Sequence, residues 1–113
     1  MHELDITQRI VNTAIETGEK AGARKITSVR VVVGEFTGVE PSCLEFYFNA
    51  LTQGTMAAGA ELLVEVTPLA ATCGSCGKPF APQELRFRCP SCDSTKVEIT
   101  SGRELQVESV DVE

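Results

Sequence analysis

Residues 26–33 read ITSVRVVV, and the rest of the predicted fold is arranged around the strand that they form. Val29, Val31 and Val33 share one face of this strand, which is the alternation expected of a half-buried β-strand. The glycine-containing segment 34–38 that follows is predicted to be a loop. The valine face needs apolar partners, and the segments on either side supply them.

Two amphipathic helices are predicted, one on each side of this strand in the sequence. Residues 5–21 carry apolar residues at helical spacing and end before Gly22. A second helix begins at Glu40-Pro41, because proline in the first helical position loses no hydrogen bond, and ends at Gly54. Its apolar residues recur at i, i+3, i+4 and i+7 and predict a core-facing stripe: Leu44, Tyr47, Phe48 and Leu51.

Two further strands complete the predicted sheet. Residues 62–67 follow the second helix, and a strand–helix–strand unit is expected to be a right-handed crossover with parallel strands. Residues 105–112 form the last strand, in which the apolar positions change parity after Val107, so a bulge is predicted near Glu108-Ser109. The chain leaves and re-enters the sheet at one place, which favours antiparallel pairing of the second and last strands.

Composition excludes several classes of protein. The net charge of −6 suits a phosphate backbone poorly, and no apolar run approaches the length of a membrane-spanning helix. The first residues contain two acids and no apolar signal segment, so we expect a cytoplasmic protein. Five cysteines in such a chain favour metal binding over disulfides.

Four of the cysteines form two closely spaced pairs. Cys73-Gly74-Ser75-Cys76 and Cys89-Pro90-Ser91-Cys92 are separated by the twelve residues 77–88. Two such turns supply four thiolates in a tetrahedron, which suits Zn²⁺ and leaves no position open for a substrate, so the predicted zinc is structural. Two alternatives remain: a pair of disulfides, and iron, because a Cys-Pro-Ser-Cys turn is typical of rubredoxin.

The predicted fold is therefore α+β, a small α/β sheet of about three strands, mixed in direction, with two helices on one face and an inserted zinc-ribbon knob. Residues 1–67 together with 103–113 are predicted to form one domain, and residues 68–102 the insert. Charge divides in the same way. The insert has four basic and three acidic residues and so a net charge of +1. Because the whole chain has a net charge of −6, the remainder has a net charge of −7.

His2 is the only histidine in the chain. It can be read as an ordinary exposed terminal residue. At position two, however, the α-amine of Met1, the amide nitrogen of His2 and its imidazole can chelate one Ni²⁺ or Cu²⁺ ion, and Glu3 could complete the set. The imidazole must be neutral to bind, so affinity should fall in acid, near the reference histidine pKa of about 6.5.

Other residues carry weaker signals. Cys43 is expected to be a small, mostly buried thiol, since the chain offers no second histidine to activate it. Arg86-Phe87-Arg88 is predicted to be a strand with one buried aromatic. We find no phosphate loop and no nucleophile–base pair, so an enzyme is not expected.

Several short motifs occur together in this chain. They are Met1-His2-Glu3-Leu4, Val33-Gly34-Glu35-Phe36, Gly38-Val39-Glu40-Pro41-Ser42, Leu44-Glu45-Phe46, Gly59-Ala60-Glu61-Leu62, the two cysteine pairs and Gly102-Arg103-Glu104-Leu105. With these motifs, in this order, the chain resembles the HypA/HybF family of hydrogenase-maturation nickel chaperones over essentially its whole length.

The resemblance implies a function and a set of sites. The protein would deliver Ni²⁺ to the large-subunit precursor of a nickel–iron hydrogenase, working with the GTPase HypB. Nickel would bind at His2, with Met1 and Glu3 as further possible ligands, and Glu40 lies where some members have an acid suspected near nickel. Structural zinc would be held by Cys73, Cys76, Cys89 and Cys92. The alternative is a zinc-ribbon adaptor that binds protein or RNA and has no nickel role; whether the chain forms a homo-oligomer is left open.

Overall fold

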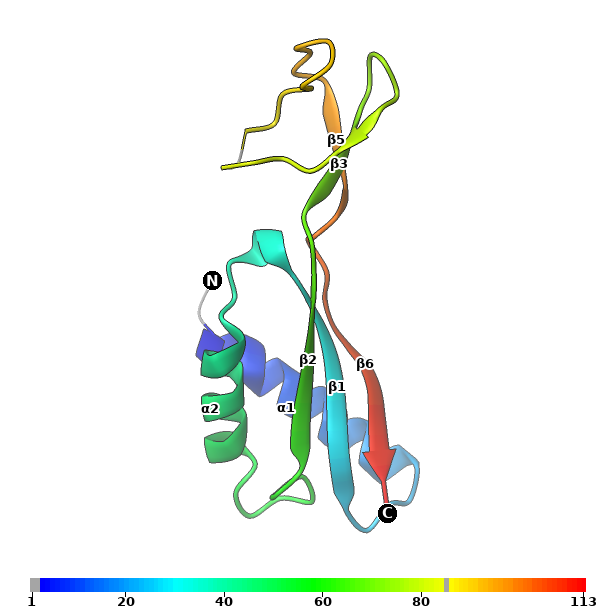
Figure 1. Cartoon of the computed structure of the whole chain (residues 1–113). Coiled ribbons are helices and arrows are strands. Elements are labelled where there is room, and N and C mark those ends of the chain that lie inside the picture. The colour runs from blue at the N-terminus through cyan, green and yellow to red at the C-terminus, as the bar shows by residue number, and fades with distance from the viewer. Residues whose placement is uncertain (1–2, 85) are drawn as a thin grey trace.

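The computed structural model describes residues 3–84 and 86–113 and shows an elongated molecule of 55 × 24 × 16 Å (Figure 1). The lower part, here called the base, contains α1 (Glu3–Lys20), β1 (Ile26–Gly34), the short 3-10 helix η1 (Glu35–Thr37), α2 (Pro41–Leu51), β2 (Glu61–Thr67) and β6 (Leu105–Val112). The upper part, the knob of residues 70–101, contains β3 (Ala70–Cys73), β4 (Pro79–Phe80) and β5 (Val97–Ser101). The α+β class, the mixed three-stranded sheet and the two helices are confirmed.

The order of strands in the base is β2-β1-β6, so the predicted pairing of residues 62–67 with residues 105–112 is wrong. β1 lies between them, parallel to β2 as predicted and antiparallel to β6. The reason is burial. Most of β1 is buried, and the central position covers both of its edges, whereas an edge position would expose one. The chain instead makes its antiparallel return inside the knob, where β3 pairs with β5.

The bulge predicted near Glu108-Ser109 is confirmed. Arg30 pairs with Ser109 and Val31 pairs with Val107, so Glu108 is the extra residue in β6. The bulge places apolar residues of opposite parity on the same face, where Leu105, Val107 and Val110 all pack against the core.

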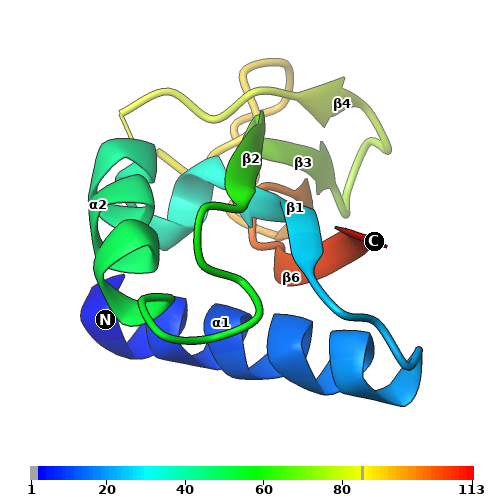
Figure 2. The same ribbon diagram turned by 90° about the horizontal axis from the view of Figure 1, so that it is seen from below.

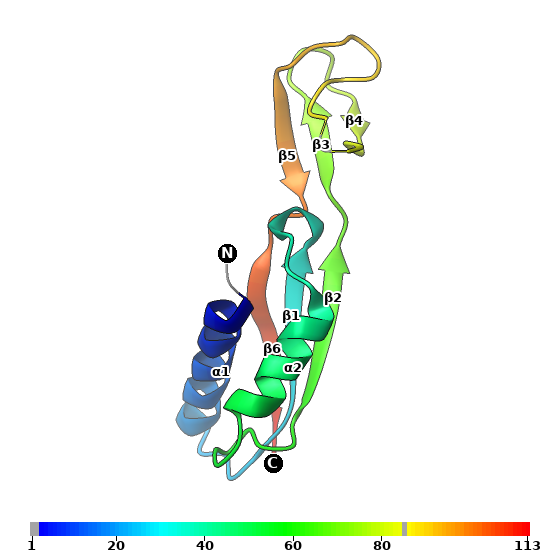
Figure 3. The same cartoon turned by 90° about the vertical axis from the view of Figure 1, so that its left-hand side faces the viewer.

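Both helices cover the valine face of the sheet, with α1 beside β6 and α2 beside β2 (Figures 2 and 3). The core between these layers consists of twelve buried residues: Ile6, Ile10, Val11, Ala14, Ile26, Val29, Val31, Val33, Leu44, Phe48, Ala57 and Ala60. Of the stripe predicted on α2, Leu44 and Phe48 are buried, while Tyr47 and Leu51 are half-buried. No helix in the described ranges is both long enough and apolar enough to cross a membrane.

Two short segments, 68–69 and 102–104, join the knob to the base and are here called the neck. The neck is fixed to the end of β1 by backbone hydrogen bonds: the Gly34 amide donates to the Glu104 carbonyl at 2.6 Å, and the Phe36 amide donates to the Gly102 carbonyl at 2.8 Å. On the other side, the Ser101 hydroxyl donates to the Pro68 carbonyl at 2.8 Å. These bonds make the neck a packed joint rather than a flexible linker.

The Glu104 carboxylate ties the returning segment of the neck to the end of β2. Its Oε1 accepts hydrogen bonds from the Gly102 amide at 2.7 Å and from the Thr67 hydroxyl at 2.8 Å. Its own backbone N–H, the Thr67 hydroxyl and the Gly102 amide lower the pKa of this carboxyl group below its ordinary 4.5. The ionised form is therefore the one that the fold prefers.

Glu104→Gln should remove a pH-dependent part of the stability. A carboxylate whose pKa is lowered by folding contributes stability that is fully present above 4.5 and lost as the pH falls through the lowered value. The variant should therefore unfold at lower urea concentration than the wild type at neutral pH, and the difference should shrink in acid. The matched control is Glu65→Gln, because Glu65 is exposed. If the difference in stability between the wild type and Glu104→Gln did not change with pH, folding would not lower the pKa of Glu104.

Candidate metal centre

Two turns of similar construction carry the four paired cysteines. In the first, the Gly77 amide donates to the Cys73 carbonyl at 2.9 Å; in the second, the Asp93 amide donates to the Cys89 carbonyl at 2.8 Å. Gly77 and Asp93 both have positive φ, 76° and 63°, which closes each turn tightly after its second cysteine. Each Cys-x-x-Cys segment therefore folds back so that both of its sulfurs point to the same side.

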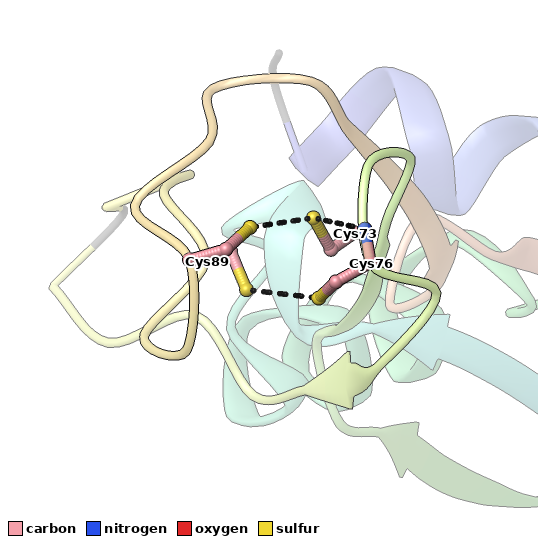
Figure 4. A group of neighbouring side chains, drawn as sticks. Cys73, Cys76 and Cys89 are labelled. Atoms are coloured by element: carbon pink, nitrogen blue, oxygen red, sulfur yellow. Dashed lines mark hydrogen bonds between the residues drawn. The ribbon is translucent and has the colours of Figure 1, made fainter.

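The four sulfurs meet between these turns. Their Sγ atoms all lie within 4.8 Å of one another, with 3.5 Å between Cys73 and Cys92 and 3.6 Å between Cys76 and Cys89. Figure 4 shows the side chains of Cys73 and Cys76 facing that of Cys89. All five cysteines of the chain are free, so the pairs are not disulfides. The prediction that the four cysteines lie together in one cluster is confirmed.

Backbone amides favour the thiolate form at two positions. The Cys76 amide and, after it, the Ser75 amide lower the pKa of Cys73 to about 6, against the opposing effect of burial. The amides of Cys92 and Ser91 lower the pKa of Cys89 in the same way. At Cys92 the Ser94 amide also lowers the pKa, but the other sulfurs and burial together outweigh it and raise the pKa to about 12. Four thiolates this close repel one another, and a divalent cation among them would remove that repulsion.

This donor set fits a metal ion, and zinc in particular. Zn–S bonds of about 2.3 Å would place the sulfurs of a tetrahedral site about 3.8 Å apart, close to the separations found here. Thiolate sulfur is a soft donor that binds zinc and iron well, and four sulfurs saturate a tetrahedral ion. Cys73 and Cys89 are buried and Cys76 and Cys92 exposed, so the cluster lies at the surface of the knob. It is the only group of three or more potential metal ligands in residues 3–84 and 86–113.

The structure does not test the predicted nickel ligands as a set. Met1 and His2 lie outside the described residues, and Glu3 is the first residue of α1, with its carbonyl accepting the Thr7 hydroxyl at 2.6 Å. Glu40 precedes α2, where its carboxylate accepts the Ser42 hydroxyl at 3.3 Å. α1 begins at the end of the base nearer the knob and runs away from it (Figure 3). The metal-binding role of all these residues stays a prediction.

Two predictions about other residues need correction or qualification. Residues 86–88 are not a strand, because no neighbouring segment of the described chain pairs with them; Phe87 instead packs edge-on against Phe36, with ring centroids 5.7 Å apart. Cys43 is half-buried in α2 rather than mostly buried. No sequence pattern signals the Phe36–Phe87 contact, since the two residues are far apart in the chain and neither lies in a periodic pattern.

A mixed sheet with two helices, carrying a four-cysteine cluster on a second small sheet, defines a small metal-binding protein. The family model described as "Hydrogenase/urease nickel incorporation, metallochaperone, hypA" matches residues 1–112. The chain belongs to this family, HypA.

Individual relatives agree with the family match. The "Hydrogenase maturation factor HypA" of Caldanaerobacter subterraneus subsp. tengcongensis is 41% identical over 114 residues, which cover 100% of both chains. The protein of the same name from Aquifex aeolicus is 36% identical over 113 residues, 100% of this chain and 98% of its own. The solution structure of the Ni metallochaperone HypA from Helicobacter pylori superposes with a TM-score of 0.69 at 25% identity, over 99% of this chain and 97% of that one.

Proposed function

We propose that this protein is a nickel carrier that binds Ni²⁺ through its N-terminus and delivers it to the large-subunit precursor of a nickel–iron hydrogenase. The observation that carries the proposal is the match to the HypA family over residues 1–112, which include the Met1-His2-Glu3 motif. The carrier acts without catalysing a reaction, in the cytoplasm and together with a HypB-type GTPase.

The N-terminal chemistry suits a cargo that must be taken up and released. The Met1 amine, the His2 amide nitrogen and the His2 imidazole can enclose Ni²⁺ in fused chelate rings, a nitrogen set that this ion prefers. Glu3, the first residue of α1 and the neighbour of His2 in the sequence, is a further possible ligand. Such a site is open on several sides, so a competing ligand on the receiving protein can approach the ion.

The four-cysteine cluster has a different role in this proposal. Cys73, Cys76, Cys89 and Cys92 hold a structural Zn²⁺, because four sulfur ligands leave no position for exchange. Within the described part of the knob only Ala71, Cys73 and Cys89 are buried, which is too small a core to hold the segment folded. The bound ion would supply the missing stability.

Extending the N-terminus tests the nickel site directly. Two extra residues ahead of Met1 keep His2 and leave the fold alone, but they remove the free amine from the chelate. Nickel affinity should then fall by about tenfold or more, because losing an interaction that supports a metal site typically costs this much. The measurement is a calorimetric Ni²⁺ titration, with zinc content measured in parallel and expected to stay at one ion per chain.

A matched substitution separates the two candidate functions. His2→Ala should weaken nickel binding in the same way without loss of stability, while the exposed Gln8→Ala on α1 should change nothing. Unchanged nickel affinity in both the extended protein and His2→Ala would contradict the proposal. That result would favour the alternative, a zinc-ribbon adaptor without a nickel role.

A further inference from the structure

The contact between Phe36 and Phe87 joins the base to the knob at a point separate from the neck. The two rings meet at 5.7 Å and 90°, the edge-to-face arrangement that aromatic pairs favour. Phe36 belongs to η1 at the end of β1, and Phe87 lies between the two cysteine pairs. Phe36 is 40% exposed even with Phe87 against it, so its ring lies at the surface.

The base side of this contact is fixed by the neck. The Phe36 amide donates to the Gly102 carbonyl at 2.8 Å, and the Thr37 hydroxyl donates to the Gly34 carbonyl at 2.7 Å. Gly38 then ends η1 in the left-handed conformation, with its amide donating to the Glu35 carbonyl. Phe36 is thus presented from a turn whose backbone is held at both ends.

The knob side of the contact has little support of its own. In the described residues of segment 81–88, the one backbone hydrogen bond runs from the Arg86 amide to the Gln83 carbonyl, at 2.9 Å. The next firm attachment is Cys89, two residues beyond Phe87, whose amide donates to the Ser94 carbonyl at 2.9 Å and whose sulfur lies in the four-cysteine cluster. The position of Phe87 therefore follows that of Cys89.

We propose that Phe36 and Phe87 form a latch that is closed only while a metal ion is bound by the four cysteines. The ion holds Cys89, Cys89 holds Phe87 two residues away, and Phe87 then covers Phe36. Loss of the ion releases Cys89, and the aromatic pair separates. The inference rests on the proposed metal occupancy of the cluster but not on nickel binding.

The chain contains no tryptophan, so a single introduced tryptophan would report on the latch by its fluorescence alone. In a Phe36→Trp protein loaded with zinc, the indole should pack on Phe87. Chelation should shift its emission to longer wavelength and raise its quenching by acrylamide about twofold or more, because the indole loses the cover of the Phe87 ring. Release of zinc is measured in the same sample with a chromogenic chelator.

Two matched variants decide between the latch and a general loosening of the protein. In Phe36→Trp combined with Phe87→Ala, the indole should already be exposed, and chelation should add no further change. A reporter placed on α2, Leu51→Trp, should not respond to chelation, because Leu51 packs against the core of the base, which a general loosening would expose and opening of the latch would not.

Three results would overturn the latch. They are unchanged indole emission from the Phe36→Trp protein although zinc has left, an equal response with and without Phe87, and purified protein that holds no metal at the cysteines. In case the tryptophan variant does not fold, the ring resonances of Phe36 in the unaltered protein give the same answer by NMR. If the titration showed no Ni²⁺ binding while chelation of zinc still changed the indole emission, the carrier function would be refuted and the latch would not.

Discussion

Replacing Cys89 with alanine is expected to unfold the knob while the base stays folded. The substitution removes one of four sulfur ligands, and binding at such sites supplies on the order of 10–16 kcal/mol in zinc-finger peptides. The knob has almost no alternative source of stability, since the buried apolar residues of its described part are Ala71 and two of the cysteines themselves. The base has its own core of twelve buried residues, none of which belongs to the knob.

Hydrogen exchange measured residue by residue tests this expectation. Amides of β3 and β5 should lose their protection in Cys89→Ala, while amides of β1, α1 and α2 keep theirs. Zinc content should fall well below one ion per chain. Ser91→Ala is the control, because Ser91 contacts the Cys89 sulfur through its backbone amide at 3.4 Å, and that contact survives the substitution.

The colour of the purified wild-type protein distinguishes zinc from iron. Zinc leaves the protein colourless, whereas iron at four thiolates would colour it red.

Two results of the exchange experiment would contradict the expectation. Collapse of the base along with the knob in Cys89→Ala would show that the two parts form one cooperative unit. Retained protection in the knob without metal would show that the cysteines are not its main support.

The sequence was sufficient for the features that depend on local patterns. Alternating valines predict β1, helical spacing predicts both helices, and the change of parity after Val107 predicts the bulge at Glu108. The paired cysteines predict the cluster because a Cys-x-x-Cys turn brings its two sulfurs to one side whatever surrounds it.

The features that the sequence did not reveal depend on contacts between distant segments. The order of strands follows from which strand must be buried on both edges, and local periodicity carries no information about this. The Phe36–Phe87 contact and the Glu104 hydrogen bonds arise only once the neck has been built. The last two features lie at or beside the joint between the two sheets, where no single segment determines the outcome.

Replacing Gly34 with alanine is expected to be among the most damaging changes in the chain that spare the metal centre. Gly34 has an ordinary φ of −76°, so its backbone conformation does not require glycine. The space around it does, because a Cβ at this position would overlap the carbonyl group of Gly102. Gly102 has no room to retreat, since a Cβ built on it would itself lie 2.7 Å from the Leu69 Cα.

Only backbone atoms are available to move, so the neck must open to admit a methyl group. Overpacking of this kind costs about 3 kcal/mol, the upper end of the usual range, because no flexible side chain can yield. The free energy of unfolding of Gly34→Ala, measured in urea, should be lower than that of the wild type by this amount. The latch and the hydrogen bond from Phe36 to Gly102 should weaken with it, since both depend on the position of the neck.

Gly38→Ala provides the matched control four residues away. Gly38 has a φ of 71°, and a Cβ there would meet nothing within 4 Å, so alanine costs only the left-handed strain of about 1 kcal/mol. The expected order of stability is therefore wild type, then Gly38→Ala, then Gly34→Ala. If Gly34→Ala were as stable as Gly38→Ala, the neck would be free to widen, and the packed joint that holds the knob at a fixed angle on the base would not exist.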